Sequence, residues 1–280
     1  MDSQRRNFSM GNVIASTFRL IFHNLGLVFG ASLVFFGLPL AAIKVFGRNG
    51  SSDIAAVPAQ EMLWMGITAI AVIVLFAPLQ ALVAIIAMRT ATGGSADLRY
   101  TVKGAVRQVP GSIALAGTLA LVLLAVIAIL IPGTGIFLPW AFGAERQEEW
   151  AWGFGFGVIL GLGVAVIVLH VLYVLWIVAL PAKAIEKVSV LGALRRSRQL
   201  TCDARSKITV LIWVYWIFSG IVTLFSGLLM MLGGLGEFIA TGVTFAINAA
   251  MAAAGSAAIY AELRGKKDGP DTDELASVFA

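Results

Sequence analysis

The run "WGFGFGVILGLGVAVIVLHVLYVLWIVAL" (152–180) contains no Asp, Glu, Lys or Arg. An α-helix rises ~1.5 Å per residue, so about 20 apolar residues cross the hydrocarbon core of a bilayer. This run is longer than that minimum and is expected to tilt or to extend beyond the core. It therefore predicts a transmembrane helix and places the chain among membrane proteins.

The composition of the 280 residues supports the same class. Hydrophobic residues make up 59% of the chain and charged residues 12%, whereas a soluble domain carries about 25% charged residues. Five further apolar runs are long enough to span, at about 25–43, 62–88, 112–131, 208–232 and 238–261. Pro39 and Pro78 lie inside two of these runs and are expected to kink them. The glycines of "GFGFGVILGLG" (153–163) and "GLLMMLGGLG" (227–236) predict close helix packing. The sequence predicts an all-α protein with six spans in a single integral membrane domain.

The 20 Lys and Arg residues are distributed unequally between the two sides of these spans. Three of them (Lys44, Arg48 and Arg146) fall on one side and the other seventeen fall on the opposite side. The positive-inside rule then puts both termini and the basic loops in the cytoplasm, as expected for a bacterial inner membrane. The net charge of +5 does not indicate a nucleic-acid partner, because little soluble surface remains to present it.

Two local features give weaker signals. The segment before Leu25 lacks a cleavage-site pattern, so the first span is expected to remain as a signal-anchor. Cys202 is the single cysteine and stands in no metal, redox or disulfide pattern. No metal or cofactor is expected.

A short pattern recurs before each odd-numbered span. The segments "LIFHN" (20–24), "GAVRQ" (104–108) and "GALRR" (192–196) begin 84 and 88 residues apart. They predict three repeats of two spans each, at about 8–88, 97–180 and 188–263, followed by a cytoplasmic tail at 264–280.

Each repeat is expected to begin with a basic amphipathic helix along the cytoplasmic interface. In 14–25, the apolar face holds Ile14, Phe18, Ile21, Phe22 and Leu25. In 98–109, Lys103 and Arg107 oppose an apolar face of Leu98, Val102, Ala105, Val106 and Val109. In the third copy Arg195 takes the place of Arg107. Each cation near an anionic leaflet contributes about 1 kcal/mol before screening. The expected contacts for anionic lipid, or else for a membrane-protein partner or a second copy of the chain, are Arg19, Lys103, Arg107, Arg195, Arg196 and Arg198.

Three neutral polar side chains lie inside the even-numbered spans: Gln80, His170 and Asn248. They stand at similar heights and could converge near the axis of a threefold bundle. One interpretation is interhelical hydrogen bonding, at about 0.6–2 kcal/mol per contact. The other is a small polar site for a headgroup, an ion or another ligand.

Two segments carry a family resemblance. The segment "LPAKAIEKVSVLGALRRSRQLT" (180–201) resembles the pattern P-A-x-x-x-E followed by A-L-x-R-S-x-x-L-T of the glycerophosphoryl diester phosphodiesterase membrane-domain family. The segment "AAIYAELRGKKDGPDTDELA" (257–276) is similar to the closing pattern of that family, with an aromatic residue and a Leu-Arg pair. Before residue 180 the likeness is general, in hydropathy and in the opening "FSMGNVIASTFRLIFHN".

The resemblance implies a bacterial polytopic membrane protein and a structural signature at Pro181, Glu186, Arg195, Arg196 and Ser197. Glu186 is expected to pair with a nearby arginine and to orient the following helix. The soluble phosphodiesterase domain of some members is absent from these 280 residues, so the resemblance does not imply their enzymatic activity.

Three functions remain open at this point. The first is a non-catalytic scaffold or lipid-associated accessory protein that uses its basic cytoplasmic helices. The second is a transporter, channel or lipid-translocating protein that uses the three intramembrane polar residues. An enzyme acting on lipid phosphodiesters ranks third, because the sequence contains no catalytic or metal-ligand motif.

Overall fold

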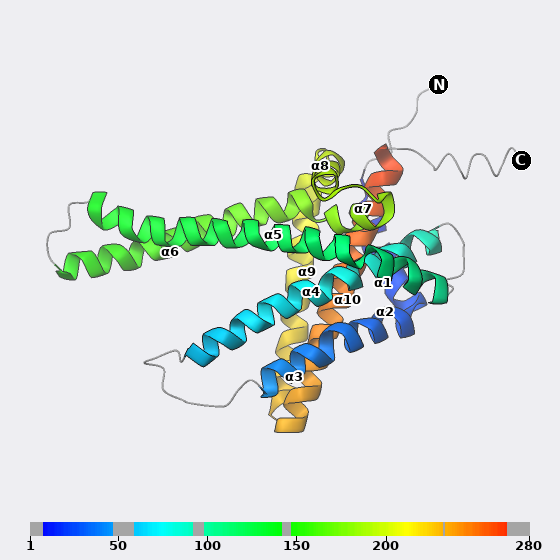
Figure 1. Cartoon of the computed structure of the whole chain (residues 1–280), viewed down its shortest axis with the longest axis horizontal. Coiled ribbons are helices and arrows are strands. Elements are labelled where there is room, and N and C mark those ends of the chain that lie inside the picture. Colours follow the sequence, from blue (N-terminus) through cyan, green and yellow to red (C-terminus); the bar gives the residue numbers. More distant parts are fainter. Residues whose placement is uncertain (1–7, 47–58, 92–97, 142–146, 232, 268–280) are drawn as a thin grey trace, which may run out of the picture.

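The computed structural model describes residues 8–46, 59–91, 98–141, 147–231 and 233–267, and every element in these ranges is a helix (Figure 1). The all-α fold is therefore confirmed. The elements are α1 (Met10–His23), α2 (Leu25–Ser32), the π-helix η1 (Leu33–Gly37), α3 (Leu38–Phe46), α4 (Ala59–Ala91), α5 (Leu98–Ala141), α6 (Gln147–Trp176), α7 (Ala179–Glu186), α8 (Val190–Thr201), α9 (Arg205–Met230) and α10 (Gly234–Lys267).

Five helical stretches within the described ranges are long and apolar enough to cross a membrane: Leu25–Ile43, Lys103–Leu130, Trp152–Glu186, Arg205–Leu229 and Gly234–Lys267. They support the prediction of a multi-pass membrane protein. The remaining expected span, 62–88, falls in α4, where the described apolar stretch is the shorter Val74–Arg89. The last span is longer than expected. Helix α10 continues to Lys267, so residues 264–267, which were expected in the cytoplasmic tail, are helical.

The two intraspan prolines have different effects. The first span is interrupted at η1, where the Leu38 N–H donates to the Leu33 carbonyl just before Pro39. This wider turn accommodates a ring that would otherwise collide with the carbonyl four residues earlier. The predicted distortion at Pro39 is therefore confirmed. In contrast, α4 is assigned as one helix through Pro78.

The run 152–180 is divided by a turn at Ile177 and Val178. Pro181 lies in the first turn of α7, where its missing N–H is tolerated but cannot bond to the carbonyl of Ile177. The chain thus changes from α6 to α7 before it leaves the apolar region.

The prediction of a separate helix at 98–109 is wrong. Residues 98–109 are the first turns of α5, which continues through Pro110 to Ala141. Only the first and third copies form separate helices before their spans, α1 and α8. The second copy therefore differs from the other two in its local structure.

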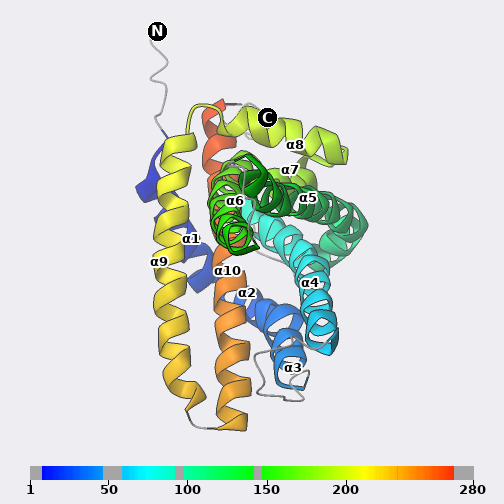
Figure 2. The same cartoon turned by 90° about the vertical axis from the view of Figure 1, so that its left-hand side faces the viewer.

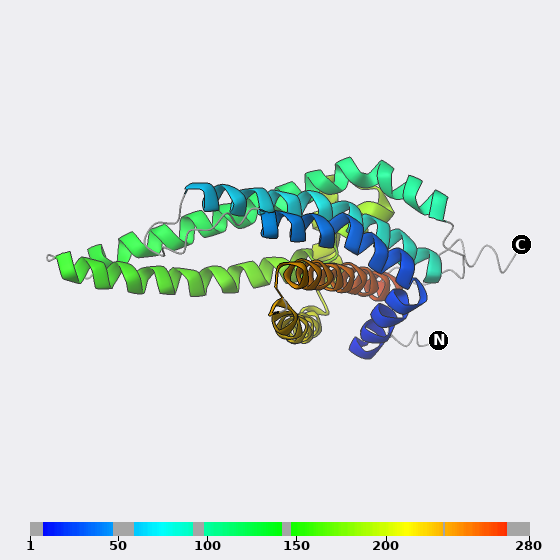
Figure 3. The ribbon, with the colours of Figure 1, turned by 90° about the horizontal axis from the view of Figure 1, so that it is seen from below.

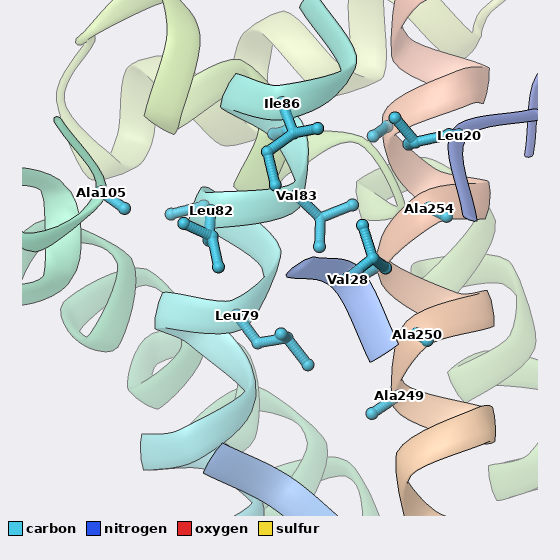
Figure 4. Packing of buried hydrophobic residues seen from close by; sticks show 14 of the residues in the cluster. Leu20, Val28, Leu79, Leu82, Val83, Ile86, Ala105, Ala249, Ala250 and Ala254 are labelled. Atoms are coloured by element: carbon cyan, nitrogen blue, oxygen red, sulfur yellow. The ribbon is translucent and has the colours of Figure 1, made fainter. Parts of the chain in front are cut away.

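Small residues let other helices approach α10 closely. Its alanines at 249, 250, 253, 254 and 257 are buried against α2, η1 and α4 in one apolar cluster (Figure 4). Gly37 also packs on this helix, and a Cβ atom built on it would collide with the Gly242 carbonyl oxygen. The core of the described part is thus centred on α10.

The glycines expected to make close helix contacts do so only in part. Gly157 and Gly161 are buried. A Cβ atom at Gly155, Gly163 or Gly227 would meet no atom of another element within 4 Å, so the prediction of close packing is wrong at these three positions.

The α5 and α6 helices pair along their length and run crosswise to the α9 and α10 pair (Figures 1 to 3). Large apolar side chains, among them Leu121, Leu124, Ile129, Ile159 and Ile167, are exposed over this hairpin. This placement differs from the threefold arrangement expected from the repeat. A bilayer normal that follows α9 and α10 cannot also follow α5 and α6 as they lie here.

Candidate functional site

Three helices meet at the carboxylate of Glu186. The Arg196 Nε on α8 donates to Glu186 Oε1 and Oε2 at 3.0 and 3.1 Å, and the Tyr260 hydroxyl on α10 donates to Oε1 at 2.8 Å. The Glu186 and Arg196 side chains are 20% and 25% exposed, so water screens their ion pair only in part. The expected pairing of Glu186 with an arginine is confirmed. We call these three residues the Glu186 cluster.

The chain between α7 and α8 reverses tightly and brings the two partners together. Lys187 follows Glu186 with a left-handed φ of 52°, and Ser189 caps α8 by accepting from the Gly192 N–H at 3.1 Å. The Lys183 Nζ closes the turn by donating to the Val188 carbonyl at 2.7 Å. An extended Ser189 is the preferred geometry for an N-cap. These contacts direct α8 back over α7.

Ser197 and Pro181 hold α8 and α7 against the neighbouring helices. The Ser197 hydroxyl donates to the Leu175 carbonyl of α6 at 2.8 Å, and Pro181 is buried. Leu175 lies in the last turns of α6, where a carbonyl has lost its intrahelical partner. The residues of the first family-like segment therefore form one packed junction.

Tyr260 was not identified from the sequence as part of this site. It is fully buried, and it comes from the second family-like segment, 257–276, as the aromatic residue of "AAIYAELRG". The two segments that carry the resemblance thus meet at the Glu186 cluster. That shared pattern was the one available signal, because nothing local to Tyr260 indicates a partner at residue 186.

The three arginines of α8 divide between its two faces. Arg196 faces the Glu186 cluster, while Arg195 and Arg198 are exposed and make no ion pair with any described residue. On the inner face of α8, the buried side chains are those of Ala193, Ser197 and Leu200. Figure 2 shows α8 beside the upper end of α10, extending away from α9 above α7 and α5.

The end of α10 is tied to α8 as well. The Lys267 ammonium donates to the Gln199 carbonyl and lies 3.4 Å from the Asp203 carboxylate. The outer face of α8 is thus a cationic surface on a helix held along its length.

The outer face of α1 is apolar instead. Val13, Thr17, Leu20 and Ile21 are buried, whereas Ile14, Phe18, Phe22 and Leu25 are exposed, and the rings of Phe18 and Phe22 stack 6.1 Å apart. Of the apolar face expected from the sequence, Ile21 alone is buried. Arg19 is exposed beside this stripe.

On α5, Lys103 and Arg107 are exposed and Ala105 between them is buried. The two cations and Ala105 therefore lie as expected, with the cations exposed and Ala105 on the buried side. Val106 departs from it, because it was assigned to the apolar face and is 61% exposed.

The three intramembrane polar residues occupy different surroundings. Gln80 of α4 accepts from the Ser256 hydroxyl of α10 at 2.8 Å, deep in the core. The His170 Nε2 and the Asn248 Oδ1 are buried without a hydrogen-bond partner in the described part. His170 lies instead beside Trp213, with ring centroids 6.1 Å apart. No hydrogen bond joins any two of the three.

Within the described ranges, no group of three or more His, Cys, Asp and Glu residues lies close enough to hold a metal ion. Both oxygens of Glu186 already accept from protein donors, so the cluster acts as a structural ion pair. Comparison with protein-family models, curated proteins and solved structures gives no match for this chain.

Proposed function

We propose that this chain is a non-catalytic multi-pass protein of a bacterial inner membrane whose outer α8 face binds anionic lipid headgroups. The observation that carries the proposal is the division of arginines on α8. Arg196 is held inward by Glu186, which leaves Arg195 and Arg198 on the outside without an acidic partner in the described part. Two such cations would contribute about 2 kcal/mol toward an anionic leaflet before screening by salt.

The fixed position of α8 supports this role. Its inner face is buried, and Glu186, Leu175 and Lys267 contact it from three other helices. A surface that is already ordered loses little conformational entropy when it binds. The same argument applies to a membrane-protein partner or a second copy of the chain, which remain alternatives to lipid.

In this proposal α1 acts as the second contact with the membrane surface. Its exposed stripe of Ile14, Phe18 and Phe22 continues into Leu25, the first residue of α2, where a candidate span begins. An amphipathic helix of this kind lies in the interface with its apolar face among the acyl chains. Arg19 would then extend toward the headgroups.

Orientation and span number belong to the same proposal. The unequal distribution of Lys and Arg supports cytoplasmic termini and a cytoplasmic α8. Six spans require the α5 and α6 hairpin to stand beside α9 and α10, with the change of direction at the break around Ile177 and Val178. The exposed apolar surface of the α5 and α6 hairpin favours hydrocarbon whether the hairpin stands beside α9 and α10 or lies crosswise to them. The resemblance over 180–276 is a further reason to propose this class of protein.

The test is the charge of the outer α8 face. In the double variant Arg195→Glu and Arg198→Glu, we expect phosphatidylglycerol binding by the purified protein to fall about tenfold, with membrane insertion unchanged. The matched control is Arg195→Lys with Arg198→Lys, which keeps the charge and should bind within about twofold of the parent. Native mass spectrometry against phosphatidylglycerol and phosphatidylcholine measures both. Unchanged binding in the charge-reversed variant would exclude α8 as the contact surface.

The transport alternative has less support. Gln80 is buried and hydrogen-bonded between α4 and α10, which favours the packing role for this residue. A hydrated path between α4, α6 and α10, detected by water-soluble thiol reagents on introduced cysteines, would favour transport instead.

A further inference from the structure

The outer face of α8 carries a row of exposed side chains. Leu191, Arg195 and Arg198 stand four and three residues apart, and this spacing places them above one another on a helix. All three are exposed, Leu191 to 75%, and the exposed Cys202 continues the row just past the end of α8. Followed from the end of α8 nearest α9, the row has two cations first and a large apolar side chain last. We call it the α8 row.

The end of α10 lies beside the cationic end of the α8 row. Lys267, the last residue of α10, donates to the Gln199 carbonyl and pairs with the Asp203 carboxylate. Figure 2 shows the upper end of α10 next to α8. These contacts and the Glu186 cluster link α8 to α7 and α10 and involve neither α5 nor α6, so they hold for either placement of that hairpin. The chain that follows Lys267 therefore starts next to Arg198.

The segment that follows is "DGPDTDELASVFA" (268–280), which lies outside the described residues. We call it the acidic segment, because it contains acids at 268, 271, 273 and 274 and no Lys or Arg. Its large apolar residues, Leu275, Val278 and Phe279, come after the acids. Charge is thus followed by apolar side chains, which is the order found along the α8 row from the same starting point.

We propose that the acidic segment folds back along the outer face of α8, where its carboxylates pair with Arg195 and Arg198 and its apolar residues cover Leu191. The consequence rests on the function proposed above, because the segment then competes with anionic headgroups for the same two arginines. A tethered partner acts at an effective concentration on the order of millimolar, so it can compete even though each surface ion pair is weak.

The length of the acidic segment is sufficient for this contact. Arg195 lies four residues from Gln199, or about 6 Å along α8, and Leu191 lies eight residues from it, or about 12 Å. An extended chain covers up to about 13 Å between Lys267 and Asp271, and about 26 Å between Lys267 and Leu275. The dipeptide Gly269–Pro270 is typical of a turn, which allows the chain to change direction directly after α10.

Charge favours α8 over the membrane as the place where the acidic segment lies. An anionic leaflet attracts cations and repels carboxylates. Arg195 and Arg198 have no acidic partner in the described part of the chain, and they stand within a few residues of the point where the segment begins. Surface charges attract one another over about 8 Å at physiological ionic strength, so the nearest partners for the carboxylates are these two arginines.

The first experiment measures the contact in full-length protein without lipid. In the Thr272→Cys variant, a short bis-maleimide can join the introduced cysteine to Cys202 at the end of the α8 row. Adding Arg195→Glu and Arg198→Glu should slow cross-linking about fivefold, the effect of two surface ion pairs. Arg195→Lys with Arg198→Lys is the matched control and should stay within about twofold. Labelling by N-ethylmaleimide corrects each rate for thiol reactivity.

The second experiment measures competition with lipid. Asp268→Asn, Asp271→Asn, Asp273→Asn and Glu274→Gln together remove the charge of the acidic segment and keep its size. Phosphatidylglycerol should then bind about fivefold more tightly in native mass spectrometry, because the arginines are released from their partners. The matched control, Thr272→Ala with Ser277→Ala, keeps all four acids and should stay within about twofold. In protein that also carries Arg195→Glu and Arg198→Glu, neutralising the segment should give no gain.

The two experiments separate this proposal from the function on which it rests. Equally fast cross-linking in the charge-reversed protein would overturn the contact, whatever lipid binding shows. Charge-dependent cross-linking would support the contact, and if no variant of α8 or of the segment changed phosphatidylglycerol binding, the lipid role of α8 and the competition would both be excluded. Cross-links between two chains rather than within one would overturn the intramolecular contact and assign the segment to a second copy.

Discussion

The helices α10 and α5 are both long and apolar, but they are used in opposite ways. In the apolar stretch of α10, 44% of the residues are buried inside the protein, whereas in that of α5 only 6% are buried. The buried positions of α10 are mostly Ala, Gly, Ser and Thr, while the exposed positions of α5 include Leu121, Leu124 and Ile129.

The difference lies in side-chain size rather than in hydropathy. Without a hydrophobic driving force between helices in lipid, close contact depends on backbones that can approach one another, which small residues permit. Large side chains gain as much from lipid as from protein, so α5 can remain exposed. The two helices therefore teach that high hydropathy identifies a span, and small residues identify its protein-facing side.

The largest effect is expected from adding volume to α10. Ala253→Leu should lower the free energy of unfolding by about 3 kcal/mol, because Ala253 is fully buried in the core of α2 and α4. Ala128→Leu on the exposed surface of α5 is the matched control and should change it by less than about 0.5 kcal/mol. Thermal unfolding in detergent measures both variants. Equal destabilisation by the two changes would show that α5 is packed as tightly as α10.

The Glu186 cluster extends this comparison to the polar end of α10. Glu186→Ala removes the acceptor of both Arg196 and Tyr260, and we expect a loss of about 2 kcal/mol, below the value for a fully buried pair because some exposure remains. Arg195→Ala, one residue from Arg196 and exposed, should change stability by less than about 0.5 kcal/mol. The same unfolding assay measures both variants. A Glu186→Ala protein as stable as the parent would show that the cluster does not hold α8 in place.

Substitution to Ala should affect stability in opposite directions at two glycines where the first span contacts α10. Gly37→Ala places a Cβ atom into the Gly242 carbonyl and should cost about 1–2 kcal/mol. Gly242→Ala meets its nearest atom, the Ala41 Cβ, at 3.6 Å and should be neutral or stabilise by up to about 1 kcal/mol through helix propensity. If the two changes destabilised equally, the close approach at Gly37 would not be the cause.

The smallest expected effect comes from cysteine labelling, which tests how the α5 and α6 hairpin lies in the membrane relative to α9 and α10. Cys202 is the single cysteine and is exposed in the turn between α8 and α9. We expect a membrane-impermeant maleimide to label it only from the cytoplasmic face. In a Cys202→Ser background, Trp150→Cys should be labelled only from the outer face if the α5 and α6 hairpin spans. Protection of that cysteine from both faces would instead support the crosswise placement of Figure 1.

The sequence predicted those features that local physics determines. Hydropathy over about 20 residues identified the five helices that are long and apolar enough to span, and the distortion of the helix before Pro39 followed from its missing N–H. The pairing of Glu186 with an arginine was also foreseen, because only ten residues separate Glu186 from Arg196.

Features that depend on distant contacts were missed. The helical periodicity of 14–25 identified the apolar residues of α1 but not which of them would face the protein, because that depends on α10. Tyr260 lies 74 residues from Glu186, and nothing nearby marks it as a partner. The crosswise hairpin and the continuous α5 likewise reflect packing that no single segment encodes.

The anchoring of α1 has a consequence for the order in which the chain assembles. The Lys207 Nζ donates to the Phe8 carbonyl at 2.9 Å, and the Ser9 N–H donates to the Glu262 carboxylate at 3.2 Å. Synthesis proceeds from the N-terminus, so residues 8 and 9 leave the ribosome about two hundred residues before the first of these partners exists. The first helix to be made is therefore among the last to find its place, and until α9 and α10 are inserted its apolar residues have only the membrane surface to cover them.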